Sequence, residues 1–327
     1  MRAVCYAHTG PAGEVLQNVD VPRPEAGPGE VLVRLAASGI NPADAKRRAG
    51  WGGMAMQHDR IIPHCDGAGT IEAVGDGVSA ARVGEPVWLW NAQGGYGEAG
   101  RAEGTAAEYI ALPSAQAVAL PSHFTLDQGA CLGVPAMTAH RCILSDGPVS
   151  GLTVLVQGGA GAVGYLAVQI ARAEGARVLA TVSMPEAAER LRAQAVEPIQ
   201  RHTQDVTAAV MQATRGAGVD RIVEVDFAAN QQVDSHLLKP NGTVCSYSST
   251  SDPNPTLDYY AFASRGATLR FIQGFALPEA ARAEAISWLA SHTLDIPIAA
   301  RLPLARCAEA HQLVEAGGGF GQVIVVP

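Results

Sequence analysis

The chain lacks spaced metal-binding cysteines and histidines, a long apolar run, and any excess of positive charge. Its six cysteines show no CxxC spacing and its nine histidines no HxxxH or HExxH pair, so we expect free thiols and no metal site. No apolar run approaches the roughly 20 residues that cross a bilayer. The formal charge of −8 argues against binding to nucleic acid or to an anionic membrane. The N-terminus resembles a strand without a signal-peptide core, so we expect a soluble, cytoplasmic protein.

What is present is enough apolar sequence for two domains: 48% of the 327 residues are hydrophobic. Residues 1–123 are β-rich, with alternating strands expected at 31–35, 69–75 and 86–90. Glycine and proline interrupt this region every 8–12 residues or so, which is typical of a small barrel-like domain.

Residues 124–264 show a different pattern, in which short apolar strands alternate with amphipathic helices. This alternation predicts a doubly wound parallel sheet, a Rossmann domain. The expected strands lie at 153–156, 177–182, 221–225 and 243–246. Residues 265–327 are expected to return to the first domain, with a strand at 268–271, helices at 280–291 and 305–316, and a last strand at 323–326.

The first strand of the α/β region leads into a glycine-rich turn and then a helix. Gly158, Gly161 and Gly164 stand at GxxGxxG spacing. A tight turn here requires residues without a Cβ clash, and the N–H groups at the start of the helix can hold a pyrophosphate. The strand–turn–helix context makes a dinucleotide site the favoured interpretation over a turn without a ligand.

The second strand of this region bears on the choice between NAD and NADP. An NAD site usually carries an acid at its end, about 20 residues after the glycines, to bind the ribose 2′-hydroxyl. Here the strand ends Thr181-Val182-Ser183-Met184. Ser183 can donate a hydrogen bond to a 2′-phosphate, and Arg201 or Arg190 can supply positive charge. We therefore favour NADPH, although Glu186 and Glu189 lie close by and weaken the cluster.

Several further segments resemble one known family over essentially the whole chain. They are residues 38–44 (SGINPAD), 66–75 (DGAGTIEAVG), 104–109 (GTAAEY) and 133–139 (GVPAMTA), together with the glycine motif. The sequence resembles the medium-chain dehydrogenase/reductases, and within them the zinc-free quinone oxidoreductases of the zeta-crystallin type. The resemblance implies a GroES-like catalytic domain beside the Rossmann domain, and it leads us to expect a homodimer.

The resemblance also implies that no catalytic zinc is present. The zinc-dependent relatives carry their three ligands at the positions of Asn41, Cys65 and Val134, where this chain offers at most one thiolate. Their structural zinc lobe corresponds here to the glycine-rich loop 91–97. Without a Lewis acid, conjugated acceptors such as quinones and enones are easier to reduce than simple carbonyls.

The same resemblance assigns the cofactor-binding residues. Those expected to contact NADPH are Asn41, Lys46, Thr138, Ala160, Gly161, Ala162, Val163, Ser183, Arg201, Phe227, Ser246, Tyr247, Ser248, Phe271, Ile272 and Gln322. Arg201 and Phe227 are expected beside the adenosine half, and residues 246–248 toward the nicotinamide. Phe271 and Ile272 are expected to close over the cofactor from the first domain.

Some residues keep two interpretations. Lys46 replaces a tyrosine of several relatives and is either a surface or phosphate contact or a catalytic cation near the reducible oxygen. Trp51 is a further candidate for the substrate pocket, while Trp88 and Trp90 fit a pocket or the core. Asp66 anchors a turn or is a pocket acid, and His64 is interpreted as structural. Water, Lys46 or Tyr247 can deliver the proton.

The sequence therefore predicts an NADPH-dependent, zinc-independent quinone reductase that acts on a small molecule. Three alternatives stay open: an enone or enoyl-thioester reductase, a nucleotide-binding protein without catalysis, and a metal-independent alcohol dehydrogenase.

Overall fold

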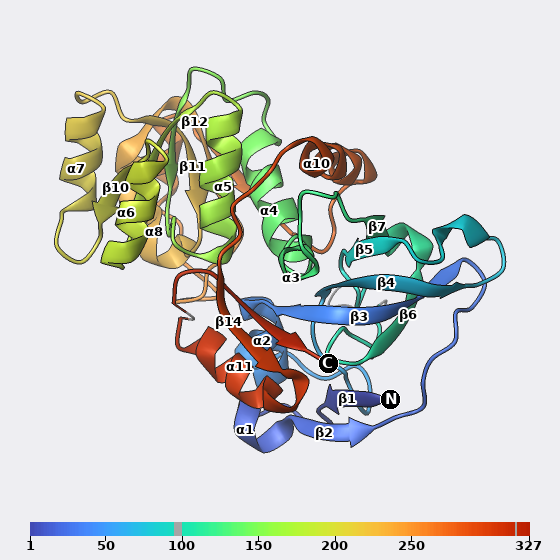
Figure 1. Ribbon diagram of the computed structural model, residues 1–327. Helices are drawn as coiled ribbons and strands as arrows, with labels where there is room; N and C mark the ends of the chain where they lie inside the picture. The colour runs from blue at the N-terminus through green and yellow to red at the C-terminus, as the bar shows by residue number, and fades with distance from the viewer. Residues whose placement is uncertain (95–99, 318) are drawn as a thin grey trace. The chain divides into compact units, whose positions relative to one another are not determined.

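The chain forms two compact units in the computed structural model, which describes residues 1–94, 100–317 and 319–327 (Figure 1). Unit 1 comprises Met1–Pro135 and Ile286–Pro327, and unit 2 comprises Ala136–Ala285. Each unit has its own sheet and its own core. Within the described ranges, no helix is long and apolar enough to cross a membrane.

Unit 1 is built on a largely antiparallel seven-stranded sheet in the order β14-β15-β3-β4-β5-β7, with β6 pairing to β3. A separate antiparallel pair joins β1 (Arg2–Cys5) to β2 (Gln17–Asp20). The strands of the large sheet are β3 (Glu30–Ile40), β4 (Asp66–Val74), β5 (Pro86–Leu89), β6 (Tyr109–Pro113), β7 (Ala117–Ala119), β14 (Ile298–Pro303) and β15 (Gln322–Val326).

The alternation of apolar residues along β3 explains why this strand lies at the centre of the sheet. Val31, Val33 and Leu35 face one core, which they share with Ile71 and Val87 of the neighbouring strands. Residues of period two reach the same face of a strand, so the pattern fixes the register. Trp88 and Trp90 are buried as well, which places both in the core of unit 1.

Short helices connect and cover these strands. They are α1 (Ala12–Val15), α2 (Pro42–Ala49), α3 (Leu126–Gly129) and α11 (Cys307–Glu315), with 3₁₀ turns at Trp51–Gly53, Ala80–Arg82, Ser114–Gln116 and Leu304–Arg306. Proline at the first position of α2 has no N–H to leave unpaired, and Gly50 ends the helix at a φ of 71°. Two further helices, α4 (Gly133–Leu144) and α10 (Glu279–Ser291), contain the boundaries between the units.

Unit 2 contains a six-stranded, entirely parallel sheet in the order β10-β9-β8-β11-β12-β13. The strands are β8 (Thr153–Val156), β9 (Arg177–Val182), β10 (Glu197–Gln200), β11 (Val219–Glu224), β12 (Leu238–Ser246) and β13 (Thr268–Phe271). Successive strands run outward from β8 to β10, and the chain then crosses back to β11. The strand order therefore reverses between β8 and β11, which is where doubly wound sheets bind ligands.

The helices of unit 2 return the chain between these parallel strands. They are α5 (Ala162–Ala173), α6 (Pro185–Ala193), α7 (Val206–Ala213), α8 (Phe227–Leu237) and α9 (Tyr259–Ala263). Leu155, Ile222 and Val244 of the sheet bury against Phe227 and Leu237 of α8 in one apolar cluster. Strands covered in this way are apolar throughout, and this explains their continuous hydrophobic pattern.

The doubly wound parallel sheet and the β-rich first unit are both confirmed. The assignment of residues 265–285 differs from the expectation: β13 pairs in parallel with β12, with Ser246 opposite Phe271, so this segment belongs to unit 2. The sequence boundary at residue 264 had treated this strand as part of the returning chain. A single four-residue strand carries no sign of the sheet it joins, because either sheet offers it an edge.

Candidate cofactor site

The glycine-rich turn joins β8 to α5 at the point where the strand order reverses. Gly158 has a φ of 72°, a conformation that residues with a Cβ rarely adopt. Gly161 precedes the first residue of α5, and its N–H donates to the carbonyl of Gly158 at 2.9 Å. A Cβ at Gly164 would lie only 2.2 Å from the carbonyl oxygen of Gly158. The turn is therefore closed so tightly that a Cβ at Gly164 would clash with the backbone, and the φ of Gly158 favours glycine.

A buried polar network holds this turn against its neighbours. The N–H of Gly158 donates to Thr181 Oγ1 at 2.9 Å, and Thr181 Oγ1 donates to Gln157 Oε1 at 2.9 Å. Gln157 Nε2 in turn donates to Asp234 Oδ1 at 3.0 Å. Burial and the neighbouring Glu224 raise the pKa of Asp234 well above its usual range. The network links the turn to β9 and α8.

Sequence reasoning missed these positioning residues. Gln157, Thr181 and Asp234 are buried polar side chains next to or within apolar elements. A buried polar side chain needs a partner, so a polar residue inside an apolar strand is a usable sign of such a network. Thr181 stood within a predicted strand, where threonine is also an ordinary β-former.

The start of α5 is suited to an anion. The first N–H groups of a helix have no partner within it, and the helix dipole adds positive potential there. Gly161 is exposed, and Ala162 and Val163 are partly exposed, so an anion can reach these groups. Ala160 is buried beneath the turn. The start of α5 therefore has the free N–H groups and the exposure that a pyrophosphate site needs, and the assignment of residues 160–163 to such a site stays a prediction.

A cavity of about 410 Å³ opens at the carboxyl ends of β12 and β13. Six of the predicted cofactor residues line it: Phe227, Ser246, Tyr247, Ser248, Phe271 and Ile272. The walls combine aromatic rings with serine hydroxyls and backbone groups, as in small-molecule sites generally. The rings of Phe227 and Phe271 meet edge to face with their centroids 5.7 Å apart.

Strand register and short hydrogen bonds bring these residues together. The N–H of Ile272 donates to the carbonyl of Ser246 at 2.8 Å, and the N–H of Phe227 to that of Ser248 at 3.0 Å. Burial raises the pKa of Tyr247 above its usual range, so its hydroxyl is protonated at neutral pH. Phe227 thus lies with Ser246 and Tyr247, whereas the resemblance had grouped it with Arg201.

Ser183 and Arg201 lie side by side at the ends of β9 and β10. The N–H of Arg201 donates to the carbonyl of Val182 at 3.0 Å, next to Ser183, and both side chains are exposed. This arrangement follows from β10, which pairs with β9 so that Gln200 faces Val182. The sequence reading had no strand at Glu197–Gln200, because four residues that include a proline give little β-pattern.

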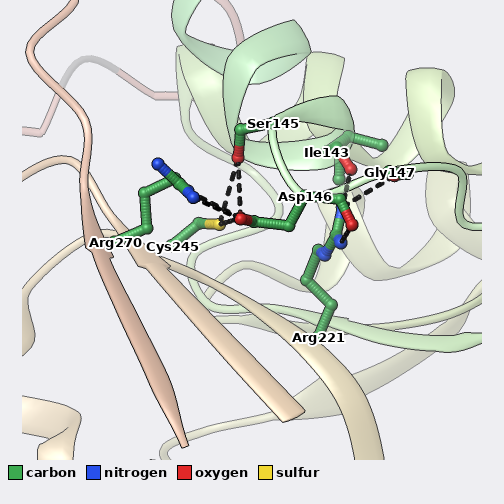
Figure 2. A network of polar contacts seen from close by, with 7 residues as sticks. All are labelled: Ile143, Ser145, Asp146, Gly147, Arg221, Cys245 and Arg270. Atoms are coloured by element: carbon green, nitrogen blue, oxygen red, sulfur yellow. Dashed lines mark hydrogen bonds and ion pairs between the residues drawn. The ribbon is translucent and has the colours of Figure 1, made fainter. Parts of the chain in front are cut away.

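Arg221 of β11 and Arg270 of β13 anchor the sheet of unit 2 to the end of α4 and to the residues that follow it (Figure 2). The guanidinium of Arg270 donates one hydrogen bond to each carboxylate oxygen of Asp146. Ser145 Oγ donates to Asp146 Oδ2 at 2.9 Å. Arg221, which is buried, donates to the carbonyls of Ile143, Asp146 and Gly147. These carbonyls lie at the C-terminal end of α4 and just beyond it. Thr138, on the same helix, is buried next to Gly274. The network fixes the helix of Thr138 relative to the strand of Phe271.

The remaining predicted residues lie in unit 1. Asn41 is buried, and its Nδ2 donates to Asp66 Oδ2 at 2.8 Å. The Nζ of Lys46 lies 4.7 Å from the ring centroid of Trp51, a cation–π contact that joins these two pocket candidates. Gln322 is buried in β15, where its N–H donates to the carbonyl of Pro297.

Asp66 ties the segment of Asn41 to the start of α4. Both of its carboxylate oxygens accept from the N–H of Val134 at 2.9 Å, in addition to the bond from Asn41. Burial raises the pKa of Asp66 to about 8. The observed contacts match the turn-anchoring interpretation of this residue.

The three positions that hold zinc in the metal-dependent relatives carry a different donor set here. Asn41 and the N–H of Val134 both bind Asp66, and Cys65 Sγ lies 3.7 Å from Gln93 Oε1. Of loop 91–97, the last three residues, Gly95, Tyr96 and Gly97, lie outside the described residues. Among the residues that the structure describes, one group of three possible metal ligands is found, His64, Cys307 and His311, at a different place in unit 1.

Known proteins resemble the chain along its full length. Residues 27–122 match the model of the alcohol dehydrogenase GroES-like domain, and residues 193–325 match that of the zinc-binding dehydrogenase domain. A quinone oxidoreductase of Lama guanicoe is 31% identical, covering 100% of this chain and 97% of the relative. A mycobacterial protein solved in complex with NADPH has a TM-score of 0.85 and 29% identity, with 100% of both chains covered. An NAD-dependent alcohol dehydrogenase has a TM-score of 0.87 and 26% identity, again over both full chains.

Proposed function

Because the chain belongs to the quinone oxidoreductase family of the medium-chain dehydrogenase/reductases, we propose that it is an NADPH-dependent, zinc-independent reductase of quinones or related conjugated carbonyls. The observation that carries the proposal is the cavity in unit 2, which gathers six residues expected to contact the cofactor. The glycine turn before α5, in the same unit, supplies the anion cradle.

Two side chains, Ser183 and Arg201, support NADPH rather than NADH as the cofactor. Ser183 and Arg201 lie at the adjoining ends of β9 and β10, where the ribose of a dinucleotide bound in a Rossmann domain is held. A hydroxyl and a guanidinium suit a 2′-phosphate, whereas a carboxylate at the end of β9 would suit a free 2′-hydroxyl.

Zinc independence is supported by the chemistry of the donors at Asn41, Cys65 and Val134. A catalytic zinc site needs three protein ligands, and here two of the positions offer an amide already bound to Asp66 and a backbone N–H. The same contacts give Asn41 a defined orientation, which suits a residue that positions the nicotinamide ring of the cofactor.

This chain contributes to catalysis by positioning the cofactor and the acceptor and by delivering a proton to the reduced acceptor. When bound, NADPH supplies a hydride to a quinone carbonyl or to the β-carbon of an enone, and one proton completes the reduction. Tyr247 lines the cavity with a protonated hydroxyl, so it is a candidate proton donor beside water and Lys46. Phe227, Phe271 and Ile272 supply apolar walls to the cavity.

The decisive experiment measures oxidation of NADPH and of NADH with 1,4-benzoquinone, 9,10-phenanthrenequinone, an enone and a simple ketone, each with and without EDTA. We expect quinone reduction that prefers NADPH and resists EDTA. Activity on the enone alone would assign the chain to enone reduction instead, and NADPH binding without turnover of any acceptor would assign a non-catalytic role. Loss of activity in EDTA would overturn zinc independence.

A matched pair of variants tests the cofactor preference. Arg201→Ala should raise the KM for NADPH by roughly tenfold, the effect of one lost charge-assisted contact, and leave that for NADH unchanged. Arg192→Ala removes an equal, exposed charge from α6 and should change neither value. Equal effects of both variants would count against a specific 2′-phosphate contact.

Light scattering of the purified protein tests the homodimer that the family resemblance implies.

A further inference from the structure

Three side chains that carry possible metal-ligand atoms meet in the core of unit 1, and one of them, His64, directly precedes Cys65. His64 precedes β4, while Cys307 and His311 lie on α11 four residues apart and so on one face of the helix. His64 Nε2 lies 2.8 Å from His311 Nε2 and 3.8 Å from Cys307 Sγ, and all three atoms lie within 4.8 Å of one another. The exposed fraction is 0% for His64 and His311 and 1% for Cys307. We call these residues the His–His–Cys cluster.

A chain of hydrogen bonds fixes the proton of His64 on the side away from the cluster. Thr105 Oγ1 donates to the carbonyl of Asp66 at 2.5 Å, so it accepts from Ser38 Oγ at 2.6 Å. Ser38 Oγ, whose proton is thereby used, accepts from His64 Nδ1 at 2.8 Å. The Nε2 lone pair of His64 therefore points into the cluster. Metal-binding histidines are oriented in this way, with the distal N–H donated to an oxygen.

The backbone of His64 gives an independent sign that this position serves its side chain. Its φ is +81°, a left-handed conformation that glycine adopts without strain and other residues rarely take. Strain of this kind concentrates where the surrounding structure needs one particular side chain in one particular place. Here it aims an imidazole at Cys307 and His311.

Charge and ligand number select the kind of cation. Two neutral imidazoles and one thiolate around a monovalent ion give a complex without net charge, which is the form that a fully buried site tolerates best. A divalent ion would leave one net positive charge inside this fully buried site, where the neighbouring Arg48 already has its own partner in Glu315. Zinc also requires a fourth ligand, whereas thiolate and imidazole are soft enough for three-coordinate Cu(I).

We propose that the His–His–Cys cluster is a binding site for a soft monovalent cation, Cu(I), held by His64 Nε2, His311 Nε2 and Cys307 Sγ. Binding replaces the thiol proton of Cys307, which leaves to solvent. It also displaces the proton that His311 Nε2 donates to His64 Nε2; this proton moves to His311 Nδ1, and the two imidazoles move apart from 2.8 Å to admit the ion. Burial raises the pKa of the Cys307 thiol, so the bond to the cation must supply the free energy that releases its proton. The site lies outside the proposed dinucleotide cavity, so its test does not depend on the proposed reductase activity.

The test uses the full chain and Cu(I) supplied anaerobically, both to the folded protein and during refolding from urea, with bicinchoninate as the competing chelator. We expect one Cu(I) per chain that survives gel filtration, and an X-ray absorption spectrum with one sulfur and two nitrogen neighbours. Parallel samples receive Zn²⁺ and Ag(I). Ag(I) should bind with the same stoichiometry, and Zn²⁺ should not displace Cu(I).

Variants separate this site from adventitious thiol binding. Cys307→Ser should lower Cu(I) affinity by at least about 100-fold, and Ser38→Ala, which releases His64 Nδ1, by about 10- to 100-fold. Cys142→Ser makes the same chemical change at another fully buried cysteine and should leave Cu(I) affinity unchanged. The proposal is overturned if neither loading route yields copper that withstands bicinchoninate, if Cys307→Ser binds Cu(I) like the parent chain, or if Zn²⁺ occupies the three ligands and Cu(I) cannot displace it.

Discussion

Substituting alanine for Gly164 tests the link between the glycine turn and the cofactor. The new Cβ would lie 2.2 Å from the carbonyl oxygen of Gly158, about 1.2 Å less than the 3.4 Å at which ordinary contact begins. It would also lie 2.9 Å from the carbonyl carbon of Gly158, so both obstacles are backbone. No side-chain rotation relieves this overlap, and the turn itself must move by about 1 Å.

A displacement of this size removes hydrogen bonds from the anion cradle, because an N–H···O contact near 2.9 Å does not survive a shift of about 1 Å. One or two bonds from the turn to a charged pyrophosphate are worth roughly 2–4 kcal/mol. Since about 1.4 kcal/mol corresponds to tenfold in affinity, Gly164→Ala should weaken NADPH binding by roughly 30- to 700-fold.

Fluorescence titration with NADPH measures this loss, and circular dichroism with thermal unfolding shows whether the variant keeps its fold. Gly13→Ala is the control, because its Cβ would meet only the side chain of Gln312, at 3.4 Å. We expect the control to bind NADPH like the parent chain. A folded Gly164→Ala protein with an unchanged Kd would refute the assignment of the pyrophosphate to this turn.

Three further predictions concern the networks of unit 2. Thr181→Val leaves the N–H of Gly158 and the Oε1 of Gln157 without their observed partner, so the free energy of unfolding in urea should fall by roughly 2–4 kcal/mol and the NADPH Kd should rise; an unchanged Kd would show that the network does not position the turn. Arg221→Met deprives three carbonyls at the end of α4 of a buried cation, and calorimetry should find a loss of about 2–4 kcal/mol, whereas a loss below about 0.5 kcal/mol would contradict the anchoring role. Burial raises the pKa of Asp234 and of Glu224, so the folded protein retains protons that the unfolded chain releases above about pH 4–5, and stability should decline as the pH rises from there toward the raised pKa values of the folded protein. In Asp234→Asn this decline should be shallower by up to about 1.4 kcal/mol per pH unit, and equal slopes in urea denaturation would contradict the raised pKa.

The glycine turn could be predicted because its requirements are local. Gly158, Gly161 and Gly164 stand in a strand–turn–helix context, and the positive φ and the close approach that the spacing implies are both observed. The parallel sheet could be predicted for a similar reason, since burial on both faces leaves continuous apolar strands. Both features depend on residues that are contiguous in the sequence.

The parts that could not be predicted depend on contacts between distant segments. Thr181 and Asp234 acquire their roles only when β9 and α8 lie beside the turn. The placement of Phe227 beside Phe271, like the inclusion of β13 in the second sheet, follows from strand pairing, which a single four-residue strand does not reveal. His64 meets Cys307 across more than 240 positions of sequence, so no motif search could join them.

The divided sequence of unit 1 has a consequence for how the chain folds during synthesis. Val323 of β15 pairs with Ile40 of β3, so the first sheet keeps an unsatisfied strand edge until nearly the whole chain has left the ribosome. Unit 2 is continuous in sequence and can form before that moment, which shortens the effective loop between the two partners. During synthesis the exposed edge of β3 is therefore the segment most open to a chaperone, or to pairing with a second nascent chain.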